Sequence, residues 1–434
     1  LMVKCHTNSS TSWVIVDNVR NPSNPRKNRL VPSSNTTEDD CCDQFEFFTT
    51  GFRANGTDTS LNGSGRKMIF LAFAADPDTT TPTLASSFSI DTYQGSGSTR
   101  VLASKFGQAF AVNGNQTFAS ASRIVLPSGV DSYPMSVSCW INVNAHSSGA
   151  TGAVVFEGEQ GQGINFTGGN PTYLFTQSQN STTGQRSSNS PLDVNRWYHV
   201  VGVFTNSTTS ALYIDGVSNN GGVSSTGDII TSDENAIGAR DHFGFPGTFD
   251  GMIDQLRIYN VALSASDVTN LFTKETVATS TQLNPTGLPS SCIAAYPLNG
   301  NANDVSGSYN ATSTQNLFFA GSNFKPDFVW TKTTSFSNNH HLFDSVRGAT
   351  KVIESNTAAA ETDESTTLTD FIENGYTLGA SSNVNTEGAN YASWKWKMLD
   401  NNNDNPELNE VGTIDALVSV NTLANQSIVK YRGN

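Results

Sequence analysis

Residues 249–260 read FDGMIDQLRIYN, a run rich in β-formers that is typical of a β-strand. Similar runs recur before it at the spacing of strands, and Asn113-Gly114 and Asp215-Gly216 mark turns between them. A helical stretch follows at 264–272. Many short strands with little helix predict an antiparallel β-sandwich or jelly roll. The other runs cover residues 108–112, 135–143, 153–157, 172–176, 196–204 and 209–215.

The composition agrees with an all-β chain and excludes several classes of protein. The chain has 434 residues, which corresponds to roughly two or three domains. Its net charge is -14 and only 14% of its residues are charged, so a protein that binds nucleic-acid phosphates is not expected. No window approaches the roughly 18 apolar residues of a membrane helix. The five scattered cysteines predict free thiols rather than disulfides or a zinc site.

The two ends of the chain carry the same motifs in the same order. Asp17 and Arg20 match Asp344 and Arg347. Each pair is followed by a Ser-Asn-Thr tripeptide and then by an acidic stretch. One shared motif could arise by chance, whereas several motifs nearly in register indicate a duplicated domain.

These matches divide the chain into predicted domains. Lys4 falls opposite Lys332, which lies inside an apolar run, so the first copy is predicted to begin partway through a strand. Residues 426–434 loosely resemble residues 317–321, and the chain is interpreted as a segment of a longer polypeptide. The predicted boundaries are 1–77 for the first β-rich copy, 78–89 for a linker, 90–275 for the sandwich, 276–315 for a linker with a partial opening strand of a second sandwich, 316–399 for the second copy, and 400–434 for a linker and the start of a further unit.

Several segments of the middle domain match a known family in their order. They are KFGQAFAVNG at 105–114, MSVSCWI at 135–141, WYHVV at 197–201, LYIDG at 212–216 and the run at 249–260. In this order they resemble the laminin-G-like, concanavalin A-like jelly-roll domains. The resemblance covers roughly residues 90–273 and implies a β-sandwich of two sheets. It also implies rim loops that often bind glycans, sometimes around a calcium ion.

The duplicated ends resemble a narrower family. Its pattern is carried by FKPDFVWTK at 324–332, FDSVRGATK at 343–351 and the run at 370–379. These segments resemble a domain of unknown function that recurs with laminin-G-like modules in tail-fibre-like proteins of marine bacteriophages. The first copy departs from the pattern, because residues 17–22 lack the Gly-Ala-Thr-Lys continuation. The resemblance implies that the chain is part of a virion appendage.

Some glycosidases share this sandwich fold, and their catalysis needs paired carboxylates. The nearest match to their Glu-x-Asp-x-x-Glu motif is Glu157-Gly158-Glu159, in a Gly-rich turn without a third acid. A Ser-His-Asp hydrolase would need a Gly-x-Ser-x-Gly elbow, which is not found. His199 is flanked by apolar strand residues and is interpreted as a packed sandwich residue. The chain is therefore predicted not to be an enzyme.

Calcium is the metal ion that the resemblance implies. Asp250 and Asp254 lie on the strand that in laminin-G-like relatives often faces the ion or its neighbourhood. Carboxylate and amide oxygens that converge from loops are the ligands that Ca²⁺ prefers. The alternative is that Asp250 holds a turn and that Asp254 pairs with Arg257 or with a backbone amide. Both interpretations stay open at this point.

A glycan site needs an aromatic face beside polar side chains. Most aromatic residues lie in predicted strands and are expected in the core. Trp394 and Trp396 alternate with lysines and share one strand face, where burial is favoured over a sugar platform. The loops at 158–170, 178–190 and 240–248 could form a rim site. The residues within reach of it are Tyr173, Arg240, His242 and Phe243.

Together these features predict a structural and adhesive segment of a bacteriophage tail fibre or another virion appendage, at the virion surface or outside the cell. The expected partners are a host-surface glycan or receptor and other virion proteins, with no nucleic acid and no membrane insertion. The expected assembly is a homo-oligomer, a trimer as in many fibres. A secreted cell-surface adhesin with the same module is the alternative. A glycan-active enzyme is the third hypothesis.

Overall fold

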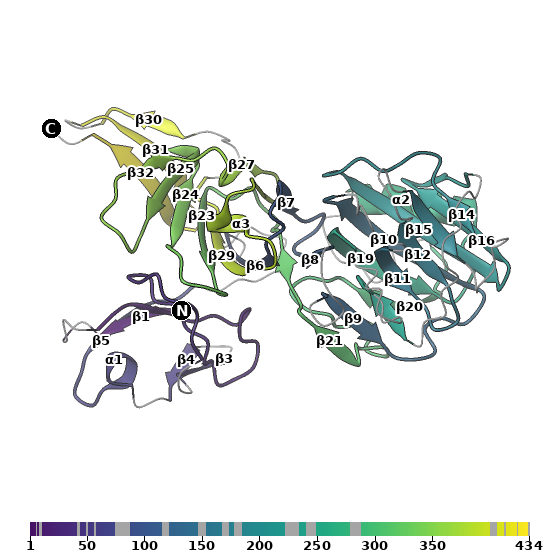
Figure 1. Ribbon diagram of the computed structural model, residues 1–434, viewed down its shortest axis with the longest axis horizontal. Coiled ribbons are helices and arrows are strands. Elements are labelled where there is room, and N and C mark those ends of the chain that lie inside the picture. The colour runs from purple at the N-terminus through teal and green to yellow at the C-terminus, as the bar shows by residue number, and fades with distance from the viewer. Residues whose placement is uncertain are drawn as a thin grey trace. The chain divides into compact units, whose positions relative to one another are not determined.

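The computed structural model of the chain divides into two compact units (Figure 1). The sandwich unit comprises residues 100–322, and the repeat unit comprises residues 1–99 and 323–434. The predicted domain boundaries follow the chain rather than its contacts, and they stay predictions. The residues that the structure describes are 1–5, 7, 11–40, 44–48, 51–55, 58–73, 87–114, 121–145, 153–166, 173–177, 185–221, 234–239, 249–277, 288–399, 406–411, 414–422 and 424–432.

Antiparallel strands of the sandwich unit form two sheets. The larger sheet is centred on β10 (Met135–Val143), which pairs with β15 (Trp197–Asn206) on one side and with β19 (Gly251–Tyr259) on the other. All residues of β10 and β19 are buried, as in strands that are covered on both faces. The order of the sheet is β17 (Val217–Ser218), β16 (Thr209–Ile214), β15, β10, β19, β8 (Ala109–Val112) and β22 (Phe319–Ala320). Strand β7 (Arg100–Ala103) precedes β8 in the chain and is not a member of this sheet.

The second sheet packs on the inner face of the first and closes the hydrophobic core. Phe110, Phe156 and Phe204 are fully buried in this core. Its apolar area stabilises the fold by about 25 cal/mol for each Å² removed from water. The predicted β-sandwich is confirmed. The order of this sheet is β14 (Arg186–Ser187), β13 (Leu174–Gln177), β12 (Gly163–Phe166), β11 (Ala153–Glu157), β18 (Asn235–Ile237), β9 (Arg123–Leu126) and β21 (Ser313–Gln315).

Helix α2 (Ala265–Val277) covers the outer face of the larger sheet (Figure 1). Its first turn is capped by Ser264, whose hydroxyl donates to Asp267 Oδ2 at 2.7 Å and accepts from the Asp267 amide at 3.2 Å. The predicted helix ended at 272, but the observed one runs on to Val277. The added turn brings Glu275 over the sheet. Among the described residues no helix is long and apolar enough to cross a bilayer.

Residues 292–320 complete the same sandwich. Strand β20 (Cys292–Tyr296) pairs with β19, β21 pairs with β9, and β22 pairs with β8. Tyr296 is fully buried and donates its hydroxyl to the Tyr309 carbonyl at 2.6 Å. The segment predicted as a linker with the opening strand of a second sandwich therefore adds β20 and β21 to the first one. Sequence matching missed this because a β-rich run does not state which strand it pairs with.

In the second copy of the repeat unit, β23 (Phe328–Thr333) pairs with β24 (His341–Asp344) and with β29 (Asn390–Trp396). The far edge of β29 pairs with β6 (Phe88–Gln94). The other elements here are β25 (Gly348–Glu354), β26 (Thr362–Asp363), the hairpin of β27 (Leu368–Ile372) and β28 (Gly375–Leu378), α3 (Ser382–Asn385), and the sheet of β30 (Glu407–Asn409), β31 (Ala416–Asn421) and β32 (Gln426–Tyr431).

The first copy repeats this order of elements. Strand β1 (Met2–Cys5) pairs with β2 (Val14–Ile15) and with β5 (Met68–Leu71), as β23 pairs with β24 and β29. A hairpin and a short helix precede the last strand in both copies. The shared order supports the duplication that the motifs predict. The hairpin of the first copy is β3 (Phe45–Phe48) with β4 (Gly51–Ala54), and its helix is α1 (Thr59–Asn62).

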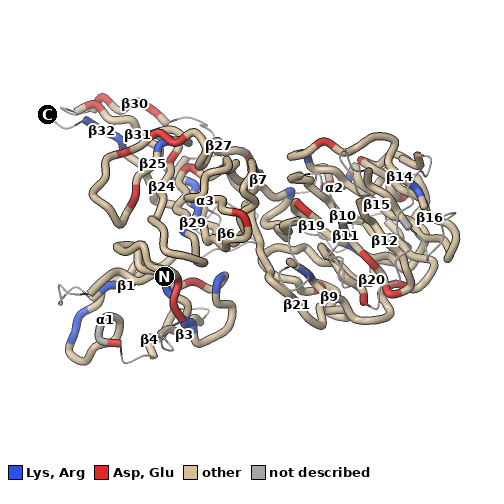
Figure 2. Tube along the Cα trace, viewed as in Figure 1, with Lys and Arg blue, Asp and Glu red and all other residues tan. Residues whose placement is uncertain are grey.

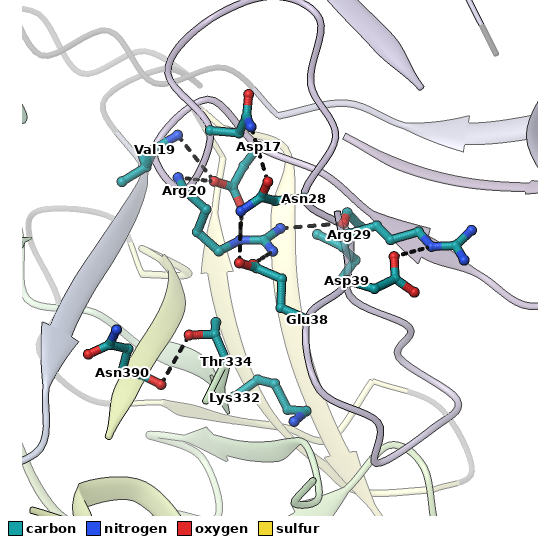
Figure 3. Close-up of polar contacts among 12 residues, drawn as sticks. Asp17, Val19, Arg20, Asn28, Arg29, Glu38, Asp39, Lys332, Thr334 and Asn390 are labelled. Atoms are coloured by element: carbon teal, nitrogen blue, oxygen red, sulfur yellow. Dashed lines mark hydrogen bonds and ion pairs between the residues drawn. The ribbon is translucent and has the colours of Figure 1, made fainter. Parts of the chain in front are cut away.

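The matched Asp-x-x-Arg motifs make the same contacts in both copies. Arg20 donates from its backbone amide and Nε to the two carboxylate oxygens of Asp17, at 2.9 and 2.7 Å, and from Nη1 to Glu38 (Figure 3). Its Nη2 donates to the Ile15 carbonyl at 3.3 Å. Arg20 thus connects a short strand to the acidic stretch that contains Glu38. We call this arginine, with its contacts to the aspartate, the glutamate and the strand carbonyl, the arginine fork. The equivalent contacts of the second copy join Arg347 to Asp344, Glu361 and the Leu342 carbonyl.

Candidate functional site

The predicted site residues belong to the sandwich unit. The structure describes Tyr173, Asp250 and Asp254. The other predicted residues, Arg240, His242 and Phe243, lie outside the described residues, and their role stays a prediction.

Tyr173 lies directly before β13 and is 37% exposed. Trp140 and Tyr259, in contrast, are buried in the strands beneath α2. Among the described aromatic residues of the sandwich unit, Tyr173 is the one that is exposed to solvent. An exposed tyrosine offers an apolar ring face and a hydroxyl, which match the apolar and polar parts of a sugar. Its role as a glycan contact stays a prediction.

Asp254 is fully buried, in the middle of β19. Its Oδ2 accepts the backbone amides of Lys105 and Phe106, at 3.1 and 2.8 Å. Burial raises the pKa of Asp254 to about 8, although these amide donors lower it. The carboxyl is therefore mostly neutral at pH 7. Of the alternatives open from the sequence, the contact with a backbone amide is the one found.

Asp250 lies just before β19 and is half-buried. Its Oδ1 accepts from Asn144 Nδ2 at 3.2 Å, and its carbonyl accepts from the Asn144 amide at 3.0 Å. The described residues contain no group of three or more His, Cys, Asp or Glu that could hold a metal ion. Asp254 does not fit a calcium ion, because its carboxyl is buried and engaged by amides. The role of Asp250 as a calcium ligand stays a prediction.

The substitution Asp254→Asn is expected to stabilise the sandwich unit at alkaline pH. The unfolded carboxyl ionises near its ordinary pKa of 3.8, whereas the folded one ionises near 8. Because the folded state holds the proton longer, stability is full below about pH 4 and falls as the pH rises toward 8. Since each unit of pKa difference corresponds to about 1.4 kcal/mol, we expect a gain of roughly 5 kcal/mol at pH 8 and almost none at pH 4. Urea unfolding of both proteins across this range measures it, and parallel pH profiles would contradict it.

A buried polar cluster, which the sequence did not reveal, lies beneath α2. Glu275 is 2% exposed and accepts from Trp140 Nε1 at 2.7 Å and from Arg257 Nη1. His199 Nε2 lies 3.5 Å from Glu275 Oε2 and 2.9 Å from Ser138 Oγ. These contacts connect the helix to β10, β15 and β19. The one signal for them in the sequence is the acidic residue that follows the predicted helix.

The Ser138, His199 and Glu275 side chains do not form a catalytic triad. In a triad the acid and the serine contact opposite nitrogens of the imidazole, whereas here both lie near Nε2. Ser138 and His199 are also fully buried. Burial lowers the pKa of His199, so its ring is neutral at pH 7. The cluster therefore holds the helix on the sheet.

Glu157 and Glu159, the nearest match to a carboxylate pair of glycosidases, lie in different environments. Glu157 is 2% exposed, at the end of β11. Glu159 lies in the following turn, where its backbone amide donates to Asn235 Oδ1 at 3.1 Å. Burial and the neighbouring Asp131 carboxylate raise the pKa of Glu159. A raised pKa suits a general acid, so this pair is the one to test for hydrolysis.

In the repeat unit, a second buried cation lies near the arginine fork of the first copy (Figure 3). Lys332 is 1% exposed and donates from Nζ to the Thr333 carbonyl at 2.8 Å. Burial lowers its pKa to about 8, while Glu38 acts in the opposite direction. The fork itself lies over a ring of the second copy, with Arg20 Cζ 5.5 Å from the centre of Trp394. These contacts pack the two copies together.

Two family models match parts of the chain. Residues 112–269 match the concanavalin A-like lectin/glucanases superfamily, in its Laminin_G_3 family. Residues 1–77 and 304–434 match a domain of unknown function, DUF7483. The chain thus carries a concanavalin A-like domain flanked by DUF7483 segments, as the resemblances indicate. No curated protein matches the chain.

Several solved structures are similar to the chain. A candidate carbohydrate-binding protein from Bacteroides ovatus is 18% identical, with a TM-score of 0.35, over 50% of this chain and 60% of that one. The heptameric SAP-like pentraxin from Limulus polyphemus is 16% identical, with a TM-score of 0.30, over 40% of this chain and 85% of that one. Domain 4 of the arabinanase AbnA from Geobacillus stearothermophilus is 21% identical, with a TM-score of 0.28, over 42% of this chain and 87% of that one.

Proposed function

We propose that the chain is a structural and adhesive segment of a bacteriophage tail fibre or another virion appendage, whose sandwich unit binds host-surface glycans. The lectin-type superfamily of residues 112–269 supports glycan binding. The sparse charges of both units, visible in Figure 2, leave the neutral polar surface that suits a sugar ligand. The flanking copies act as spacers that carry the sandwich at the virion surface.

The exposed ring of Tyr173 is the observation that carries the glycan site. After a glycan array has identified a ligand, Tyr173→Ala is expected to weaken its binding at least tenfold, about 1.4 kcal/mol. Truncation removes the ring face that stacks on the sugar and leaves the buried core intact. Titration calorimetry with the identified glycan measures the change.

A control for this variant is Val217→Ala. Val217 is 66% exposed on β17, at one end of the larger sheet, so its truncation should leave glycan binding unchanged. Equal affinity of Tyr173→Ala and the unmodified protein would refute the site. An array on which no glycan binds would refute the adhesive function itself.

Calcium enters this proposal through Asp250 alone. If Asp250 and loop residues hold an ion at the rim, glycan binding should fall when a chelator is added and return with calcium. The substitution Asp250→Asn should produce the same loss without chelator. Binding that ignores both treatments would show a glycan site that needs no metal ion.

Two other functions are separated from this proposal by simple measurements. A glycan-active enzyme should hydrolyse the bound glycan and lose that activity in Glu157→Gln or Glu159→Gln, whereas a binding module releases the glycan unchanged. A secreted adhesin would carry the same module on a cell surface. Immunogold labelling of virions distinguishes the two locations, and light scattering tests the proposed homotrimer.

A further inference from the structure

The second copy shows which strand belongs at the outer edge of this fold. Strand β6 pairs with the far edge of β29, with Asp91 opposite Ser393. The rings of Tyr93 and Tyr391 stack at 5.1 Å, and Lys395 Nζ lies 2.7 Å from Asp91 Oδ1. The strand therefore completes the sheet and its core.

In the first copy, β5 occupies the place of β29, but none of the described strands pairs with its outer edge. The exposed fractions of Ile69, Phe70 and Leu71 are 48%, 53% and 47%. An exposed apolar edge is a template for another strand, and natural proteins usually cover such an edge. The first copy thus presents the edge that β6 covers in the second.

Strand β32 shares a short sequence pattern with β6. Ser89-Ile90-x-x-Tyr93-x-Gly95 recurs as Ser427-Ile428-x-x-Tyr431-x-Gly433. In the described chain β32 pairs with β31 through one edge and forms the end of its sheet. Val429 and Tyr431, which share one face, are 50% and 67% exposed. A strand of the right pattern therefore has a free edge and an apolar face.

The charges of the two copies change together at this position. Val3 pairs with Phe70 in the first copy, and Thr331 pairs with Ser393 in the second. Phe70 is therefore the counterpart of Ser393. Two residues further on, Ala72 is the counterpart of Lys395. The shared pattern makes Val429 the counterpart of Asp91. The buried ion pair of the second copy is thus replaced by two apolar residues. At these two positions, pairing of β32 with β5 would therefore bury no unpaired charge.

We propose that the outer edge of β5 binds β32 of a second copy of this chain. The strands run antiparallel, in the register of β29 and β6, with Phe70 opposite Val429 and Met68 opposite Tyr431. Main-chain hydrogen bonds supply affinity and the alternate side chains supply specificity, as in other strand additions. The contact joins two different surfaces, so it produces rings or filaments. It is independent of glycan binding and provides a way to assemble a fibre.

The first test measures mass by light scattering as the concentration of the full chain rises. We expect growth beyond the 46.4 kDa monomer. Val429→Asp should weaken association at least tenfold, because the carboxylate would be buried against Phe70 and Ala72 without a partner. Since Val429 is half-exposed, the variant should keep its unfolding temperature. Adding Ala72→Lys should restore association by recreating the ion pair of the second copy.

The second test fixes the register by cross-linking. A mixture of Phe70→Cys and Val429→Cys proteins should form a disulfide-linked dimer, because directly opposed residues lie within disulfide reach. Neither variant alone should form it. Lys430→Cys in place of Val429→Cys is the control, since it points to the opposite face. A monomer at every concentration, an unchanged mass for Val429→Asp, or equal cross-linking at 429 and 430 would overturn the proposal.

Discussion

Replacing Glu275 by alanine is expected to lower the free energy of unfolding of the sandwich unit by about 3–5 kcal/mol. The substitution leaves the Arg257 guanidinium, itself 3% exposed, without the carboxylate that pairs with it. It also removes the acceptor of Trp140 Nε1. Hydrogen exchange in β10 and β19 measures the loss, because it reports the sandwich separately from the repeat unit.

Two further variants isolate the charge from the packing. Glu275→Gln keeps an oxygen that can accept from Trp140, so it should cost less than the alanine variant. Thr273→Ala lies on the exposed side of the same helix and should change stability by no more than about 0.5 kcal/mol. A Glu275→Ala cost as small as that of Thr273→Ala would mean that the cluster does not hold α2.

Replacing Lys395 by alanine should destabilise the second copy by a similar amount, about 3–5 kcal/mol. Lys395 and Asp91 are both fully buried, with 2.7 Å between Nζ and Oδ1. Removing the ammonium leaves the Asp91 carboxylate in the core beside Tyr376, where water cannot compensate it. Hydrogen exchange of β6 and β29 measures the effect, since these strands share the pair.

The double variant Asp91→Val with Lys395→Ala copies the residues of the matching positions, Val429 and Ala72. Because it removes both charges, it should cost less than Lys395→Ala alone. The difference between the double and single variants is the cost of an unpaired buried carboxylate. A double variant less stable than Lys395→Ala would contradict this cost, because removing the carboxylate would then have gained nothing.

The sequence was most informative where the signal is local. The run at 249–260 predicted a strand because β-forming residues recur along it between turn signals. The repeated Asp-x-x-Arg motif predicted equivalent structures, and the arginine forks of the two copies do make equivalent contacts. Alternation likewise predicted that Trp394 and Trp396 share a face and are buried. Each of these conclusions needs only residues close together in the chain.

Predictions that needed distant partners were weaker. Alternation placed Lys395 opposite the tryptophans, on a face that would ordinarily be solvated, since lysine is rarely buried. Nothing near it in the sequence indicates that Asp91 lies there. Asp250 and Asp254 were predicted to share one strand, whereas the observed β19 begins at Gly251. Only the fold shows that backbone amides of Lys105 and Phe106 already engage Asp254.

The sequence by itself determined the strand-rich composition, the jelly roll and the duplication, because these follow from periodicity, turn residues and repeated motifs. The tertiary structure alone decided which charges are buried together and which strand edges are left uncovered. The physical reason is that burial is set by whatever packs from elsewhere in the chain. These features depend on partners that local patterns do not encode: the pairs Glu275–Arg257 and Lys395–Asp91, and the edge of β5 that none of the described strands covers.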